Sequence, residues 1–176
     1  MRPFPFLLSL LLLWTLALVA QRASGFTLTS PAFGPGAAIP RVHTCDGADR
    51  SPALSWTGLP HGTRSLALIC DDPDAPVGTW DHWVLYNIPP DKAGLPEGIA
   101  SDERLPDGSL HGLNSWRRTG YGGPCPPPGK PHRYFFRLYA LDAPLGLPPR
   151  ATKGQLLAAM KGHVLGQAEV MGTYGR

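Results

Sequence analysis

The apolar residues of this 176-residue chain gather in short runs that are typical of β-strands. Residues 26–30 (FTLTS) alternate between apolar and polar positions, as a half-buried strand does. Residues 65–70 (SLALIC) and 83–88 (WVLYNI) are short continuous apolar runs of the kind that buried strands show. The longest run, residues 132–141 (HRYFFRLYAL), is largely apolar on both of its alternating faces. This run is therefore predicted to form a central strand that is covered on both sides.

One short helix is predicted near the C-terminal end of the chain. Thr152 is a suitable N-cap, and the apolar residues that follow repeat every three or four positions. These residues are Leu156, Leu157, Met160 and Val164. Gly154 and Gly162 limit the helix to about ten residues, because glycine is unfavourable inside a helix. Residues 166–174 (GQAEVMGTY) then predict a last short strand.

The segments between these elements are rich in glycine and proline, with 21 of each in the chain. Proline cannot donate a hydrogen bond to a sheet ladder, so these segments mark loops and strand ends. Short strands that are separated by such turn signals favour an all-β fold, an antiparallel β-sandwich.

Residues 1–25 have the pattern of a secretory signal peptide. An apolar run over residues 6–20 follows Arg2, and the small residues Ala23 and Gly25 stand where signal peptidase recognises its site. The alternative is an uncleaved anchor, but the run is short for a bilayer span of roughly twenty residues. We therefore expect a periplasmic or secreted protein with one domain over residues 26–176 and no transmembrane segment after cleavage.

The net charge gives no argument for nucleic-acid binding. The formal charge of the chain is +3. It falls to +1 if residues 1–25 are cleaved, because Arg2 and Arg22 are then lost. The remaining sequence has no basic run beyond Arg117 and Arg118, whereas nucleic-acid binding needs a basic patch. No nucleic-acid partner is expected.

The chain has three cysteines, and an exported protein can form a disulfide. Cys70 ends an apolar run and is interpreted as a buried strand residue. Cys45 and Cys125 lie in loops rich in glycine and proline, so an internal disulfide, if one forms, is expected between them. The alternative is three free thiols.

Two segments could carry chemistry. Residues 71–82 (DDPDAPVGTWDH) hold Asp72 and Asp74 on a loop stiffened by prolines, and they end at His82. Residues 120–134 (GYGGPCPPPGKPHRY) bring His132 and Tyr134 onto one face of the longest strand.

Three interpretations of these residues remain open. A metal site would suit the residue types, but the two histidines are fifty residues apart and show no metal-binding spacing. Acid–base catalysis is possible for a histidine beside a carboxylate, but no motif for an activated nucleophile accompanies it. The third interpretation is structural, with aspartates that cap turns and histidines that are satisfied in the core.

Four segments resemble the signature segments of the phosphatidylethanolamine-binding protein family, also called Raf kinase inhibitor-like proteins. These segments are DPDAP, GTWDHWVLYNIP, GYGGPCPPPGKPHRYFFRLYALD and TCDGADRSPALSW, and they are most similar to the bacterial and archaeal branch. The resemblance covers residues 26–176. It implies a β-sandwich with a large antiparallel sheet, a smaller sheet and short peripheral helices.

The resemblance also implies a pocket that binds a small anion or a phosphorylated headgroup. The ligand-binding residues carried over are Asp72, Asp74, Trp80, His82, Gly122, Gly123, Pro124, Pro126, His132 and Tyr134. Imidazoles, a phenol and backbone amides of the 122–127 loop would donate to the anion, and the aspartates would orient the histidines. Asp71 and Asp81 are expected to point away. The segment NSWRRTG departs from the family pattern, so Arg117 and Arg118 are expected to add positive charge nearby.

These expectations describe an exported anion-binding protein that is not an enzyme and uses no cofactor and no metal. Anion binding is expected to strengthen below about pH 6.5, where histidine becomes charged. Modulation of a partner protein is left open. The alternatives are an inhibitor of a secreted serine protease or other hydrolase, which would act through a surface loop, and an enzyme that uses the His/Asp pocket.

Overall fold

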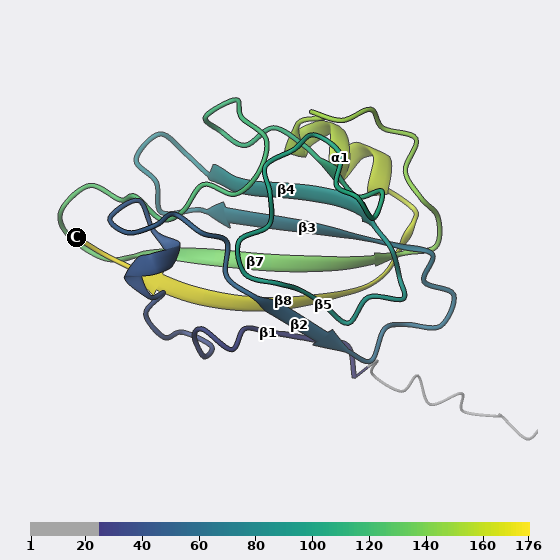
Figure 1. The fold of residues 1–176 in the computed structure, drawn as a ribbon, viewed down its shortest axis with the longest axis horizontal. Helices are drawn as coiled ribbons and strands as arrows, with labels where there is room; N and C mark the ends of the chain where they lie inside the picture. Colours follow the sequence, from purple (N-terminus) through teal and green to yellow (C-terminus); the bar gives the residue numbers. More distant parts are fainter. Residues whose placement is uncertain (1–24) are drawn as a thin grey trace, which may run out of the picture.

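The computed structural model describes residues 25–176, which form two antiparallel β-sheets with a helix outside them (Figure 1). The smaller sheet has the strand order β1-β2-β5. Its strands are β1 (Thr27–Thr29), β2 (Leu54–Thr57) and β5 (Gly94–Leu95). The predicted signal peptide falls on residues outside this range, apart from Gly25, and stays a prediction.

The larger sheet has the strand order β6-β4-β3-β7-β8, and every neighbouring pair in it is antiparallel. Its strands are β3 (Ser65–Asp72), β4 (Trp80–Ile88), β6 (Leu110–His111), β7 (His132–Leu141) and β8 (Val164–Tyr174). A 3-10 helix, η1 (Arg41–His43), and an α-helix, α1 (Lys153–Met160), complete the described elements. The predicted antiparallel sandwich with short peripheral helices is confirmed.

The large sheet is buried on both faces at its centre, because β3 alternates between two apolar clusters. Leu66 and Leu68 pack between the sheets with Leu54 of β2. Ala67 and the rest of the opposite face pack against Leu156 of α1. All eight residues of β3 are buried, so this strand is the covered centre of the sheet.

Strand β7 has the predicted bounds and lies inside the sheet, but only one of its two faces is fully covered. It lies between β3 and β8, and the face that carries Phe135, Arg137 and Tyr139 is only half-buried. The reason lies in its charges, because Arg137 needs both an ion partner and access to water. In β3, residues 65–70 carry no charge, and the buried Asp71 and Asp72 that follow each have an ionisable partner.

Helix α1 begins as predicted but ends earlier. The Thr152 side chain accepts from the Gln155 backbone, while the Gln155 side chain accepts from the Thr152 backbone, which forms a capping box. The helix ends at Met160, and Val164 already opens β8. Within residues 25–176, no helix is long and apolar enough to cross a bilayer.

Candidate functional site

A β-bulge between β3 and β4 sets the direction of His82. Cys70 pairs with Trp83 and Asp71 pairs with Asp81, so His82 is an extra residue on β4. Such a bulge changes which face a side chain points to. His82 therefore lies on the same face as Trp83, the face toward the smaller sheet. Its ring stands 5.1 Å from the ring of the core residue Tyr134.

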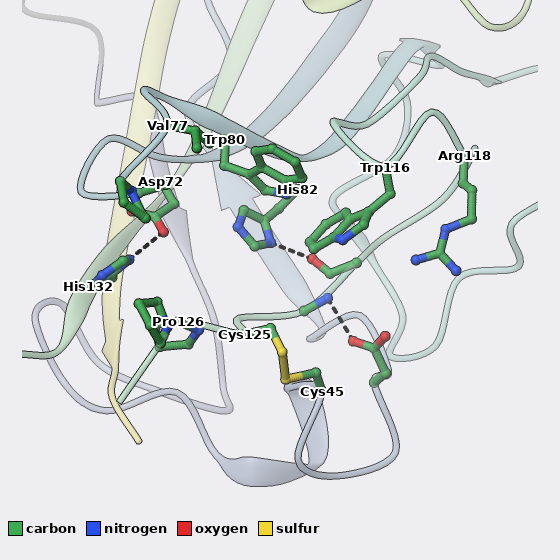
Figure 2. Close-up of a pocket in the computed structure, with 16 residues that line it drawn as sticks. Cys45, Asp72, Val77, Trp80, His82, Trp116, Arg118, Cys125, Pro126 and His132 are labelled. Atoms are coloured by element: carbon green, nitrogen blue, oxygen red, sulfur yellow. Dashed lines mark hydrogen bonds and ion pairs between the residues drawn. A yellow bond between two sulfur atoms is a disulfide. The ribbon is translucent and has the colours of Figure 1, made fainter. Parts of the chain in front are cut away.

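The bulge lies beside a cavity of about 350 Å³ at one end of the sandwich (Figure 2). Loops and strand ends from four parts of the chain contribute to its walls. The ionisable lining residues are Asp49, Asp72, His82, Arg118 and His132, and the exposed apolar ones include Val77. Trp80, Trp116 and Pro126 also line it.

His132 and Asp72 form a buried pair on one side of the cavity. Asp72 Oδ2 accepts from Nδ1 of His132 at 2.7 Å, and its other oxygen accepts from the Asp74 backbone at 2.8 Å. The two side chains are only 11% and 5% exposed. Because the carboxylate accepts, Nδ1 carries a proton, and Nε2 is left for the cavity.

His82 is held in the same tautomer by a backbone carbonyl. The oxygen of Gly122 accepts from Nδ1 of His82 at 2.6 Å. Burial lowers the pKa of His82, and the hydrogen bond to Gly122 opposes that shift only in part. Nε2 of the neutral ring is therefore an acceptor. His82 becomes a donor to the cavity only when it takes up a proton, and its lowered pKa makes that harder than for an exposed histidine.

The glycines of the 122–127 loop serve packing more than ligand donation. The N–H of Gly122 donates to the His82 carbonyl at 2.9 Å, and that of Gly123 donates to Asp49 Oδ1 at 2.7 Å. A Cβ on Gly122 would lie 2.6 Å from Trp116, and one on Gly123 would lie 2.4 Å from Asp49. These two amides are thus used within the chain, contrary to the expected donation to an anion.

The structure joins Cys45 and Cys125 by a disulfide, the pairing that their loops favoured. Both cysteines line the cavity, and the bond ties the segment of Asp49 to the 122–127 loop. Cys70 is a buried free thiol in the core, and burial raises its pKa well above the usual value. Cys70 is therefore far less reactive than an exposed thiol.

Three of the predicted ligand-binding residues do not line this cavity. Asp74 pairs with Arg133 in a neighbouring cleft, and the hydrogen bonds from Arg133 hold the pKa of Asp74 at about 2. Pro124 is buried, and its carbonyl accepts from the Cys45 backbone. Tyr134 is fully buried behind His82, and burial raises its pKa. Each supports a lining residue from behind or beside it.

Asp49 and Trp116 are among the lining residues that the sequence did not predict. Asp49 has a positive φ of 54°, which aspartate tolerates better than most residues. Trp116 packs its ring edge-on against His82 and Trp80, at 5.1 and 5.4 Å. The unusual segment NSWRRTG was the available signal for Trp116, and its Arg118 does line the cavity as expected.

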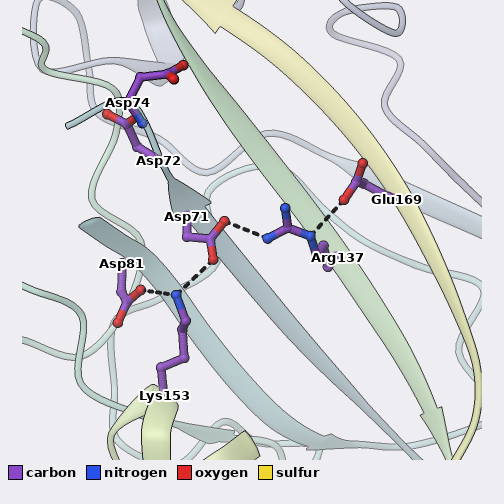
Figure 3. Close-up of polar contacts among 7 residues, drawn as sticks. All are labelled: Asp71, Asp72, Asp74, Asp81, Arg137, Lys153 and Glu169. Carbon is purple, nitrogen blue, oxygen red and sulfur yellow. Dashed lines mark hydrogen bonds and ion pairs between the residues drawn. The ribbon is translucent and has the colours of Figure 1, made fainter. Parts of the chain in front are cut away.

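The opposite face of the same sheet end holds an ion network (Figure 3). Lys153 of α1 lies 2.8 Å from Asp71 and 2.5 Å from Asp81, which are paired across β3 and β4. Arg137 of β7 contacts Asp71 at 2.6 Å and Glu169 of β8 at 2.7 Å. Burial lowers the pKa of Lys153, but its bonds to both aspartates outweigh burial and raise it. Asp71 and Asp81 thus point away from the cavity, as predicted.

No group of three histidine, cysteine, aspartate or glutamate side chains in residues 25–176 is arranged to hold a metal ion. The interpretation without a metal stays a prediction. The histidine–carboxylate pair, the second histidine and the arginine instead form the polar part of the cavity lining.

The model of the phosphatidylethanolamine-binding protein family matches residues 29–175 of this chain. The chain belongs to this family. A relative from Methanothermobacter thermautotrophicus, a UPF0098 protein, is 56% identical over 85% of this chain and 98% of its own length. Another UPF0098 protein, from Aquifex aeolicus, is 47% identical over 84% of this chain and 86% of its own length.

Solved structures of the family have the same fold. The homologue CT736 from Chlamydia trachomatis superposes with a TM-score of 0.80 at 42% identity, covering 88% of this chain and 99% of its own. YbcL from E. coli, described as a new member of the mammalian family, gives 0.79 at 33% identity, with 86% and 98% covered. The predicted family and its two-sheet fold are confirmed.

Proposed function

We propose that this protein is exported and binds a small phosphorylated anion in the cavity, without catalysing a reaction on it. The observation that carries the proposal is the arrangement of His132 and His82. Each ring is fixed through Nδ1, by Asp72 and by the Gly122 carbonyl. Each therefore keeps Nε2 for a ligand in the cavity that both residues line.

The charges of the lining make binding depend on protons. With neutral histidines, Asp49 and Asp72 outnumber Arg118 by one charge, so a bare anion is repelled. Protonation of His82 cancels this net negative charge and turns an acceptor into a donor. A ligand with an ammonium group or a protonated phosphate oxygen would also satisfy the acceptors. Binding of an anion is therefore expected to take up protons and to strengthen as the pH falls.

The lining supports binding more than covalent catalysis. Among the described lining residues there is no serine, threonine or lysine, and both cysteines are in the disulfide. A covalent mechanism needs an activated nucleophile within reach of a base. The two histidines have the Gly122 carbonyl and Asp72 as partners instead.

Calorimetric titration with phosphate and with phosphoethanolamine, at pH 5.5 and pH 8, tests the binding function. We expect at least tenfold tighter binding at pH 5.5, and a similar loss in a His132→Asn variant. His163→Asn is the matched control, because His163 also pairs with an aspartate, Asp142, at 2.7 Å, but both are half exposed. Equal affinity at both pH values, or binding that is unaffected in His132→Asn, would contradict the proposal.

Export is tested separately. The full chain, expressed with its own leader in a bacterial host, should appear in the periplasm or medium with Phe26 as its first residue. A cytoplasmic product that still begins with the leader would contradict the exported role without affecting the binding proposal.

A further inference from the structure

We infer that the ligand of this cavity carries a second anionic group, which Arg118 binds while the first lies between His82 and His132. This inference rests on the proposed function and names the ligand class more narrowly. It predicts a small bis-anion, such as a phosphate ester that also carries a carboxylate.

The loop before the cavity holds Arg118 in place. The Asn114 side chain accepts from the backbone N–H groups of Trp116 and Arg118, at 3.1 Å each. The Arg118 carbonyl accepts from the Asn114 backbone at 2.9 Å. Arg117 takes a positive φ of 61° between them, which closes the turn. The backbone of Arg118 is thus fixed, and the residue lines the cavity while Arg117 does not.

The charge of Arg118 is not used within the described part of the chain. Arg118 takes part in none of the ion pairs there, whereas Arg133 and Arg137 on β7 are each paired with a carboxylate. Its guanidinium instead lies 6.0 Å from the centre of the Trp116 ring, at the limit of a cation–π contact. A planar guanidinium on an aromatic ring keeps its edge free for a carboxylate or phosphate.

The spacing of the two ends limits the length of the ligand. The Trp116 ring lies 5.1 Å from the His82 ring and 6.0 Å from the Arg118 guanidinium, so these two groups are at most about 11 Å apart. The first anionic group would lie about 3 Å from His82 on its His132 side, and the second about 3 Å from Arg118, so at most about 11 Å separates the two groups. A small ester with one phosphate and one carboxylate lies within that limit. Figure 2 shows His132 and Arg118 on opposite sides of the cavity, with His82 and Trp116 between them.

Asp49 makes the role of Arg118 easier to test, because its carboxylate also lines the cavity. Its Oδ1 is bound to the Gly123 amide, so Asp49 cannot turn away. The cavity is lined by the charges of Arg118, Asp49 and Asp72, and Asp72 is paired with His132. If the Arg118 charge is removed, the negative charge of Asp49 remains without a positive charge beside it. A second anionic group would then be repelled as well as unbound.

The test compares two phosphate esters with the same three-carbon skeleton, 3-phosphoglycerate and glycerol 3-phosphate, by calorimetry at low ionic strength and pH 6. They differ in one carboxylate. We expect the protein to prefer 3-phosphoglycerate by about two- to fivefold, the size of an exposed charge pair. Arg118→Gln should reduce this preference to one or reverse it. Arg117→Gln removes the same charge from the neighbouring residue and should leave the preference unchanged.

The outcomes separate the two proposals. A preference that is absent, or that persists in Arg118→Gln, or that falls equally in Arg117→Gln, overturns the second anionic group. The proposed function then stands if glycerol 3-phosphate binding is still lost in His132→Asn. If neither ester binds at millimolar concentration, both proposals fail.

Discussion

Asp71 and Asp72 are neighbours on β3, yet they belong to opposite faces of the sheet and to different kinds of site. Asp71 lies in a network where Lys153 and Arg137 use both of its oxygens. Asp72 holds one nitrogen of His132 and leaves the other to the cavity. The difference teaches that residue type alone does not identify a binding residue. What matters is whether the hydrogen-bonding capacity of its partner is used up inside the chain.

The two faces also differ in what they should tolerate. The network joins β3, β4, β7, β8 and α1, and loss of Lys153 would leave Asp81 without a cation in a partly buried place. On the cavity face, Asp72 and His132 form a single pair, so a substitution there breaks fewer ionic contacts between elements. Substitutions in the network should therefore reduce stability, and substitutions in the cavity should mainly reduce binding.

The largest effect is expected for Lys153→Met. It leaves Asp81 without a cation and directly opposite Asp71, so the free energy of unfolding should fall by about 3 kcal/mol or more. Urea unfolding at pH 7 measures it. Lys161→Met is the control, because Lys161 follows the same helix and is exposed. A loss of less than about 1 kcal/mol would mean that the network is only a set of weak surface pairs.

The two neighbouring aspartates give the next test. Asp71→Asn should cost about 2 kcal/mol of unfolding free energy, because Arg137 and Lys153 each keep one other carboxylate. Asp72→Asn should cost about 1 kcal/mol but weaken phosphate binding at pH 5.5 about tenfold. Urea unfolding measures the stability of both variants, and calorimetry measures their phosphate affinity. We expect Asp71→Asn to lose more stability and Asp72→Asn to lose more affinity. Variants that lose stability and binding in the same proportion would refute the contrast between the faces.

The pH dependence should have opposite signs for stability and for binding. Burial holds the pKa of His82 and of His111 below the ordinary value, so both are neutral when folded and take up protons on unfolding below about pH 6.5. The stability of the free protein is complete above that pH and should fall by about 1 kcal/mol by pH 5.5, while anion binding rises. A His82→Asn variant should flatten the slope, and an unchanged slope would remove His82 as a cause.

The smallest effect is expected for Asp74→Asn. Its pair with Arg133 is partly exposed, with 28% of the aspartate and 51% of the arginine side chain accessible, so water screens it. The loss of unfolding free energy should stay below about 1 kcal/mol despite the low pKa. Phosphate affinity should not change, since Asp74 lies outside the cavity. A tenfold loss of affinity would return Asp74 to the ligand site that the family resemblance predicts.

The sequence predicts the fold well where the apolar pattern is long. The runs that indicated β3, β4, β7 and β8 have six to ten residues each, and the strands that they form have eight or more. Strands β2, β5 and β6 have two to four residues, which is too short for a period to appear. Their strand geometry comes from pairing with neighbours and not from their own pattern.

The site is predictable only in part. Asp72, His82 and His132 stand in motifs that the sequence displays, and the expectation that Asp71 and Asp81 point away from the pocket is met. Asp49 and Trp116 reach the cavity from loops that only the folded chain brings together. The protonation pattern also needs the structure, because the partner on Nδ1 decides what Nε2 can do.

The extra residue at the β3–β4 bulge has a practical consequence for protein engineering. If the motif TWDHW were grafted onto a regular strand of another sandwich, strict alternation would place Asp81 and Trp83 on the same face and His82 on the other. The carboxylate would enter the core and the imidazole would face the helix. A transplanted site therefore needs the irregular strand as well as the motif, and deletion of Asp81 should turn His82 to the other face while every residue that lines the cavity keeps its identity.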